Sequence, residues 1–193
     1  MKQFLNLIAT LTHPVFLPLY GILIYHPLIN KYDGTVFILT GVWYSFVYLI
    51  LPILYFIRVK KINLVYPDLE QREVIFKTYV AIGLVMSVLS YFMMTEYMPF
   101  FIGLTIWHAI LYVFSAIKLK ASWHTAAWSY LFLCSLIVKF TNNFVGRYEV
   151  IAFFGILLLI VFTLRWHQKA HTLFELGMGL AAGAATSTLL LFI

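Results

Sequence analysis

One polar segment in the C-terminal part of the chain carries the residue types and spacing of nucleophilic catalysis. Arg165 is followed after five residues by His171, and Glu175 lies four residues beyond this histidine. On a helix that begins near Thr172, positions four apart share a face, so the Glu175 carboxylate can accept a hydrogen bond from one imidazole nitrogen of His171. The other nitrogen can then attack an electrophile, while the carboxylate stabilises the developing positive charge. The alternative interpretation is a helix-start glutamate beside an interfacial histidine.

Two further segments carry residues that suit phosphate binding. Ser122 is predicted to cap the helix that follows it, where unpaired backbone N–H groups attract anions, and Lys120 strengthens this preference. His124 lies two residues beyond the cap. Arg72 directly precedes a long apolar run, and a guanidinium presents several donors to phosphate oxygens. Taken alone, the segment from Lys120 to His124 is better interpreted as a capped helix flanked by lysines that reach the membrane interface, and Arg72 is weak evidence.

The order of these three segments resembles the motifs of the type 2 phosphatidic acid phosphatase superfamily, the membrane relatives of the vanadium haloperoxidases. The third motif of that family is S-R-x5-H-x3-D. In this chain Arg165, His171 and Glu175 stand at its spacing, with Leu164 in place of the serine and glutamate in place of the aspartate.

The other two motifs are matched less completely. Residues 121–124 read Ala-Ser-Trp-His where the family has Pro-Ser-Gly-His. The first motif, K-x6-R-P, is represented by Arg72 alone, because Val65 and Glu73 stand where the family has lysine and proline. The resemblance covers roughly residues 68–179.

This resemblance implies a metal-independent phosphatase that needs no cofactor. His171 would attack phosphorus and form a phosphohistidine, with Glu175 orienting it, and His124 would protonate the leaving oxygen and later activate water. The phosphate oxygens would be bound by three cations and one hydroxyl, namely Arg72, Lys120, Ser122 and Arg165. Because some of the family's phosphate donors are replaced here, a non-catalytic member is the alternative.

The remaining histidines have weaker claims to a catalytic role. His167 has no carboxylate four residues further on, since His171 itself occupies that position. His108 falls inside an apolar run and is expected to be hydrogen-bonded to a neighbouring helix. His13 and His26 both precede prolines and are expected at helix breaks.

The composition identifies the environment in which these residues must be positioned. Of the 193 residues, 63% are hydrophobic and 10% are charged, against ~45–50% and ~25% in soluble domains. We therefore predict an all-α, polytopic transmembrane helix bundle over residues 1–193, which the resemblance implies is a single phosphatase-like domain. The single cysteine, Cys134, excludes an intrachain disulfide, so helix packing must stabilise the fold.

Six or seven membrane spans are predicted. A crossing takes ~20 apolar residues, and the candidate runs are 15–29, 35–57, 76–94, 100–117, 125–138, 150–164 and 172–193. The first run is interrupted by prolines, which leaves the count between six and seven. Gly179 and Gly183 lie four apart in the last run, a spacing that allows close helix packing.

The basic residues predict which loops share a membrane face. If every run spans, one face carries ten of the 13 basic residues: Lys2, Arg58, Lys60, Lys61, Arg72, Lys77, Lys118, Lys120, Arg165 and Lys169. This face also carries the three motif segments. The positive-inside rule would place it in the cytoplasm, whereas the resemblance implies the outer side of a bacterial inner membrane, which we favour.

The motif segments are expected at the membrane interface. The expected partner is therefore a membrane lipid phosphate within the lipid bilayer. Phosphatidic acid, phosphatidylglycerophosphate, a polyprenyl diphosphate and lipid A phosphate all stay open as substrates. Nucleic acid is not expected, because the chain has no contiguous basic run. A lipid-phosphate binding or transport protein without turnover is the main competing hypothesis, and a purely structural helix bundle is the third. The sequence predicts no oligomeric state.

Overall fold

The computed structural model describes residues 8–25, 34–62, 67–93, 98–141 and 148–192, which form helices joined by short turns and loops. These ranges contain no strand, so the predicted all-α class is confirmed. The predictions for Lys2, His26 and Val65 fall outside the described residues.

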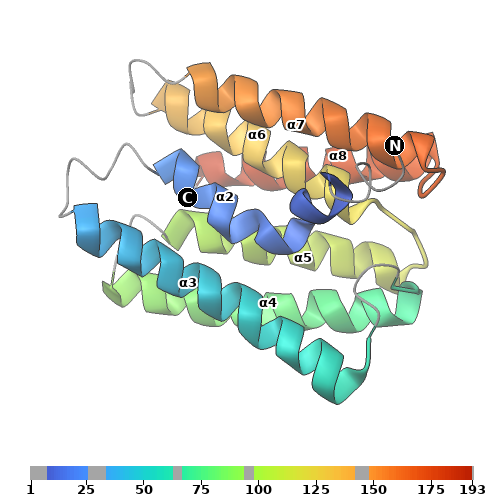
Figure 1. Ribbon diagram of the computed structural model, residues 1–193, viewed down its shortest axis with the longest axis horizontal. Helices are drawn as coiled ribbons and strands as arrows, with labels where there is room; N and C mark the ends of the chain where they lie inside the picture. Colours follow the sequence, from blue (N-terminus) through green and yellow to red (C-terminus); the bar gives the residue numbers. More distant parts are fainter. Residues whose placement is uncertain (1–7, 26–33, 63–66, 94–97, 142–147, 193) are drawn as a thin grey trace.

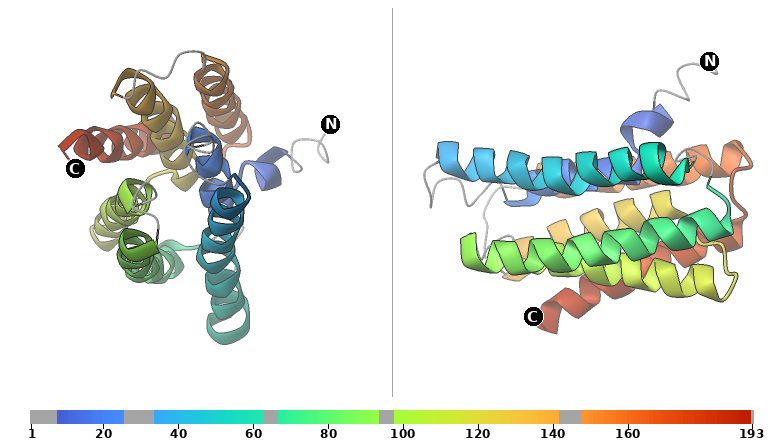
Figure 2. Two further views of the ribbon diagram at one scale, coloured as in Figure 1. Left: turned by 90° about the vertical axis from the view of Figure 1, so that its left-hand side faces the viewer. Right: turned by 90° about the horizontal axis from the view of Figure 1, so that it is seen from below.

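The helices run roughly along the long axis of the molecule (Figures 1 and 2). In chain order they are η1 (Pro14–Phe16), α2 (Leu17–Tyr25), α3 (Gly34–Leu54) with its π-helical continuation η3 (Tyr55–Lys60), α4 (Leu69–Met93), α5 (Met98–Ala116), α6 (Trp123–Thr141), α7 (Tyr148–His167), α8 (Leu173–Leu189) and η5 (Leu190–Phe192). Helix α4 pairs with α5, and α6 packs against both α7 and α8.

Five helical segments of the described part are long and apolar enough to cross a membrane: Gly41–Lys60, Leu69–Phe92, Met98–Ala116, Tyr148–His167 and Leu173–Phe192. This finding is consistent with an integral membrane protein, but it does not confirm six or seven spans. The predicted run at 15–29 is helical in α2 for nine residues, about 14 Å, and then continues into residues that are not described.

The predicted run at 125–138 lies in α6, which is not among these five segments. All nine residues at 123–131 are buried, because neighbouring helices surround this part of α6. A helix covered by protein needs no lipid-facing apolar surface, so it can carry more polar side chains than a helix in contact with lipid.

Helix α8 approaches α6 as closely as its small residues permit. A Cβ atom on Gly183 would lie 2.5 Å from the carbonyl oxygen of Ala126, and one on Gly179 would overlap the side chain of Thr125. At the same interface Ser129 Oγ donates a hydrogen bond to the Leu180 carbonyl at 3.0 Å. The close packing predicted from the two glycines is therefore present, and it sets the position of α8 relative to α6.

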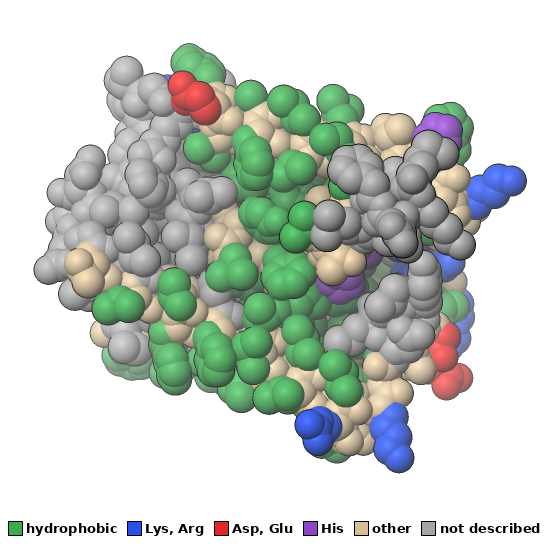
Figure 3. Space-filling view, in the orientation of Figure 1, with side chains coloured by type: hydrophobic (Ala, Val, Ile, Leu, Met, Phe, Trp, Pro, Cys, Tyr) green, Lys and Arg blue, Asp and Glu red, His purple; other side chains and the backbone are tan. Residues whose placement is uncertain are grey.

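One end of the bundle collects the positive charge. Among the described residues, every Lys and Arg except Lys139 lies at or near the end where α4, α6 and α8 begin and α7 finishes (Figure 1). In the space-filling view, basic side chains gather at this end and hydrophobic side chains cover the middle (Figure 3). The three motif segments meet at this basic end.

Candidate functional site

The first turn of α8 positions His171 and Glu175 together. Thr172 caps this helix: its Oγ1 accepts a hydrogen bond from Glu175 N at 3.2 Å, and Thr172 N donates to Glu175 Oε2 at 3.1 Å. The same Oε2 accepts a hydrogen bond from Nδ1 of His171 at 3.0 Å. The Glu175 carboxylate therefore makes the predicted contact with His171 and also caps the start of α8, as the alternative interpretation expects.

The hydrogen bond to Glu175 determines the tautomer of His171. An ionised carboxylate can only accept, so Nδ1 must carry the proton and Nε2 keeps its lone pair. His171 is buried, with 6% of its surface exposed. Burial, together with the charge of Arg165, lowers the pKa of His171 to about 4, although the Glu175 hydrogen bond acts in the opposite direction. The imidazole is therefore neutral at pH 7, which is the state that a nucleophile requires.

Ser122 caps α6 as predicted. Its Oγ accepts from Thr125 N at 3.4 Å, and its own N–H donates to the carbonyl of Glu175 at 2.9 Å, which joins the start of α6 to the start of α8. The Ser122 side chain is completely buried in this capping role. Ser122 does not line the cavity formed by Arg72, His124, Arg165 and His171, so the structure does not place the hydroxyl of this predicted phosphate ligand there.

His124 lies in the first turn of α6, before the apolar run at 125–138, and is 6% exposed. Burial is the main cause that lowers its pKa well below the ordinary value, and the nearby Arg165 and His13 lower it further. The ring of His13 stands edge-on to that of His124, with ring centroids 5.1 Å apart.

Two guanidinium groups flank the histidines. Arg72 is held by two backbone carbonyls: Nε donates to Pro67 and Nη1 donates to Ala121, each at 3.1 Å. Arg165 is 8% exposed, and its Nη1 donates to Gln168 Oε1 at 3.4 Å. The bond from Arg72 to Ala121 connects the first motif segment to the second.

These side chains converge on one small cavity. Its lining comprises two guanidinium groups, three imidazoles and no carboxylate: His13, Pro67, Arg72, Phe76, Trp123, His124, Arg165 and His171. Such a lining attracts anions. The cavity has a volume of ≈ 20 Å³, which is room for about one water molecule.

Trp123 and Phe76 form the apolar wall of this cavity, with ring centroids 5.5 Å apart. Trp123 stands at the position where the phosphatidic acid phosphatase motif has glycine, and it is 5% exposed. The indole therefore takes up space that a glycine would leave open.

Lys120 lies outside the cavity. Its Nζ is 4.0 Å from Glu175 Oε1, and its side chain lines an open hollow beside the cavity together with Lys118 and Asp68. Arg72 lines both the hollow and the cavity. The structure thus places Lys120 at the approach to the cavity.

His13 is the site residue that sequence reasoning missed. It lies at a helix break as predicted, where its Nδ1 accepts from Val15 N at 3.3 Å and caps η1. Its contact with His124 was not predicted, because the two histidines are 111 positions apart in the sequence. A polar side chain at a Pro-marked break in an otherwise apolar segment was the available signal.

The two competing histidines occupy other positions. His167 is exposed and does not line the cavity. His108 is buried, with its Nδ1 2.8 Å from the Leu104 carbonyl and 3.0 Å from the hydroxyl of Tyr48 on α3. The expected hydrogen bond from His108 to a neighbouring helix is confirmed.

The described residues contain no cluster of three or more His, Cys, Asp or Glu side chains that could hold a metal ion. The chain matches no protein-family model, no curated protein and no solved structure.

Proposed function

We propose that this chain is an integral membrane phosphatase that hydrolyses a lipid phosphate monoester or diphosphate through a phosphohistidine intermediate. The observation that carries the proposal is the state of His171. Its Nδ1 is bound to Glu175 and its Nε2 keeps a lone pair, in a buried and neutral imidazole that lines a cationic cavity. This is the geometry of an oriented nucleophile beside an anion-binding site.

In the proposed reaction, Nε2 of His171 forms a bond to phosphorus while the phosphorus–oxygen bond to the lipid breaks. The leaving oxygen takes a proton from His124 and departs as an alcohol or, from a diphosphate, as a phosphate. Water then gives a proton to His124 and attacks phosphorus, the phosphorus–nitrogen bond breaks, and inorganic phosphate leaves. Arg72 and Arg165 stabilise the charge on the nonbridging oxygens throughout.

The acid role of His124 depends on the bound phosphate. Burial and the charges of Arg165 and Arg72 keep His124 neutral. A phosphate dianion offsets these positive charges and raises the pKa of the imidazole. Substrate binding therefore supplies the protonated form that the first step consumes.

The hollow next to the cavity suits the first encounter with a lipid headgroup. Lys118, Lys120 and Arg72 line it together with the acidic residues Asp68 and Glu70, and Arg72 continues into the cavity. Because the cavity holds about one water molecule, a phosphate can enter only if a wall moves. Trp123 and His13 form part of that wall.

A second candidate function is lipid-phosphate binding or transport without turnover. The closed cavity and the capping role of Ser122 favour it, since both reduce the space and the donors available to a transition state. Binding without release of phosphate would distinguish this function from catalysis.

The number of membrane crossings, the kind of membrane and the orientation of the protein are part of the same proposal. We propose six or seven crossings, with α6 as a protein-covered span, in a bacterial inner membrane. The basic end and its cavity face the outer side, as the resemblance implies. Phosphate groups of outer-leaflet lipids would then reach the hollow directly.

The test is release of inorganic phosphate by the purified protein from phosphatidic acid, phosphatidylglycerophosphate, a polyprenyl diphosphate and lipid A. His171→Ala and His124→Ala should each lower the rate by at least ~100-fold. His167→Ala is the matched control and should keep most of the activity. Activity should survive chelation by EDTA, since Arg72 and Arg165 bind the phosphate. A fully active His171→Ala variant would contradict the mechanism.

A further inference from the structure

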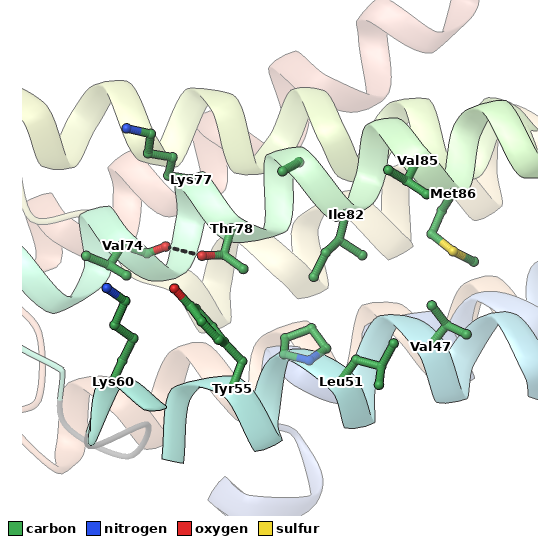
Figure 4. Close-up of a pocket in the computed structure, with 12 residues that line it drawn as sticks. Val47, Leu51, Tyr55, Lys60, Val74, Lys77, Thr78, Ile82, Val85 and Met86 are labelled. Atoms are coloured by element: carbon green, nitrogen blue, oxygen red, sulfur yellow. Dashed lines mark hydrogen bonds between the residues drawn. The ribbon is translucent and has the colours of Figure 1, made fainter. Parts of the chain in front are cut away.

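A second, larger concavity lies between α3 with its continuation η3 and the following helix α4 (Figure 4). This groove has a volume of ≈ 770 Å³ and is lined mostly by apolar side chains. Several of them face outward: Leu51 is 53% exposed and Val85 is 57% exposed. The groove is thus open on the side that a membrane would cover.

The backbone of α3 accounts for the groove. Pro52 has no N–H to bond the carbonyl four residues before it, and the chain continues as a π-helix over Tyr55–Lys60 that ends at Lys61 with φ 53°. Towards this end α3 diverges from the rest of the bundle (Figure 2). The space between α3 and α4 is therefore built into the helix geometry and is not closed by side chains.

One end of the groove is polar and cationic. Lys60 on η3 reaches towards α4, whereas Lys77 on α4 has its amine turned away from α3 (Figure 4). The hydroxyl groups of Tyr55 and Thr78 lie at the same end. The lining includes no carboxylate. Both lysines are exposed, so their flexible stems can turn towards a common anion.

The length of the whole groove, including its cationic end, is close to that of one leaflet. From Val74 to Met86 the α4 wall extends about 18 Å, slightly more than half of a hydrocarbon core of ~30 Å. Its cationic end coincides with the basic end of the bundle, where headgroups would lie.

We propose that this groove binds an anionic phospholipid, with an acyl chain along α3 and α4 and the phosphate between Lys60 and Lys77. A neutral lipid could fill the apolar length, but two lysines without a carboxylate select a negative headgroup. The site is separate from the histidine cavity, because Arg72 and Phe76 line the cavity while Val74 and Lys77 line the groove. The inference therefore does not depend on phosphatase activity.

The experiment measures the melting temperature of the purified full chain in detergent with added phosphatidylglycerol or phosphatidylcholine, and lipid retention by native mass spectrometry. Phosphatidylglycerol should raise the melting temperature by about 2–4 °C and be retained. Lys60→Gln/Lys77→Gln should lose both effects. The matched control, Arg58→Gln/Lys61→Gln, removes the same charge from the same end but outside the groove and should keep them.

A second variant tests the apolar part of the site. Ala81 lines the groove and is exposed, so Ala81→Trp should fill the groove without disturbing the core, and retention of phosphatidylglycerol should fall at least ~10-fold. Three results would each overturn the proposal: equal stabilisation by phosphatidylcholine, equal loss in the control double variant, or undiminished retention by Ala81→Trp.

Discussion

Glu175 combines two structural roles that mutagenesis can separate. One carboxylate oxygen, Oε2, accepts hydrogen bonds from both Thr172 N and His171 Nδ1. Glutamine at this position could still accept one of these bonds, but it would lose the negative charge that stabilises a developing imidazolium. The hydrogen bond to Thr172 N stabilises the helix start, whereas the negative charge of the carboxylate serves the proposed chemistry.

We expect Glu175→Gln to lower phosphate release by roughly 100-fold with a small change in melting temperature, and Glu175→Asp to be tolerated better. Thr172→Ala is the complementary control: loss of the cap should cost ~1 kcal/mol while turnover per folded molecule stays at the wild-type level. Rates and melting temperatures in detergent provide the measurement. Wild-type turnover by Glu175→Gln would assign Glu175 to the helix start alone.

The buried histidines also predict a pH dependence of stability. The pKa of His171 is about 4 in the folded protein, against ~6.5 in an unfolded chain. Between pH 4 and pH 6.5 the unfolded state binds more protons at His171 than the folded state does. The contribution of His171 to the free energy of unfolding is therefore complete above pH 6.5 and is lost as the pH falls towards 4. For His171 this loss amounts to roughly 2 kcal/mol between pH 7 and pH 5.

Melting temperatures measured from pH 7.5 to pH 4.5 check this expectation. His171→Asn removes one titrating group, so its melting temperature should fall less steeply with acidification. Because His124 is also kept neutral by burial, the slope should be reduced but not abolished. Identical slopes in the variant and the wild type would contradict the burial of His171.

At the scale of elements, the contact between α6 and α8 sets the geometry of the site. His124 lies at the start of α6, and Glu175 lies at the start of α8. A methyl group on Gly183 would approach the Ala126 carbonyl to 2.5 Å, so α8 would have to move away from α6. His124 would then move away from His171, which Glu175 holds at the start of α8.

Gly183→Ala should therefore lower both the melting temperature and phosphate release. Gly177→Ala is the matched control on the same helix, because a Cβ atom there meets nothing within 4 Å. Replacing this helical glycine should be neutral or stabilise the protein by ~0.5–1 kcal/mol with activity retained. Equal effects of the two substitutions would show that helix propensity, and not helix contact, is responsible.

At the scale of the whole molecule, the orientation in the membrane would decide which leaflet supplies the proposed lipid substrate. Helix α7 covers 20 residues, about 30 Å, which is enough to cross the bilayer. Glu149 lies in its first turn and Lys169 follows its end, and both are exposed. These positions therefore report on opposite faces.

We expect an impermeant thiol reagent to label Lys169→Cys in intact cells and to label Glu149→Cys only after the membrane is opened. The native Cys134 is buried, so it should contribute little background. The reverse labelling pattern would place the basic end in the cytoplasm, as the positive-inside rule predicts, and would overturn the proposed orientation.

Composition and local spacing determined the features that depend on neighbouring residues. The apolar content determined the all-α class, and four-residue spacing on a helix determined the contact between His171 and Glu175. Ser122 could be predicted as a cap because a capping residue and the helix that it caps are adjacent in the chain. Gly179 and Gly183 predicted a close helix contact, but not that α6 would be the partner.

The tertiary structure alone decided which distant residues share the cavity and how much space it has. The approach of His13 to His124, the wall formed by Trp123 and the position of Lys120 outside the cavity all follow from how helices far apart in sequence pack. The same packing covers α6 and leaves a groove beside α3. Periodicity shows which residues of one helix share a face, but the partner of that face depends on close packing of the whole bundle.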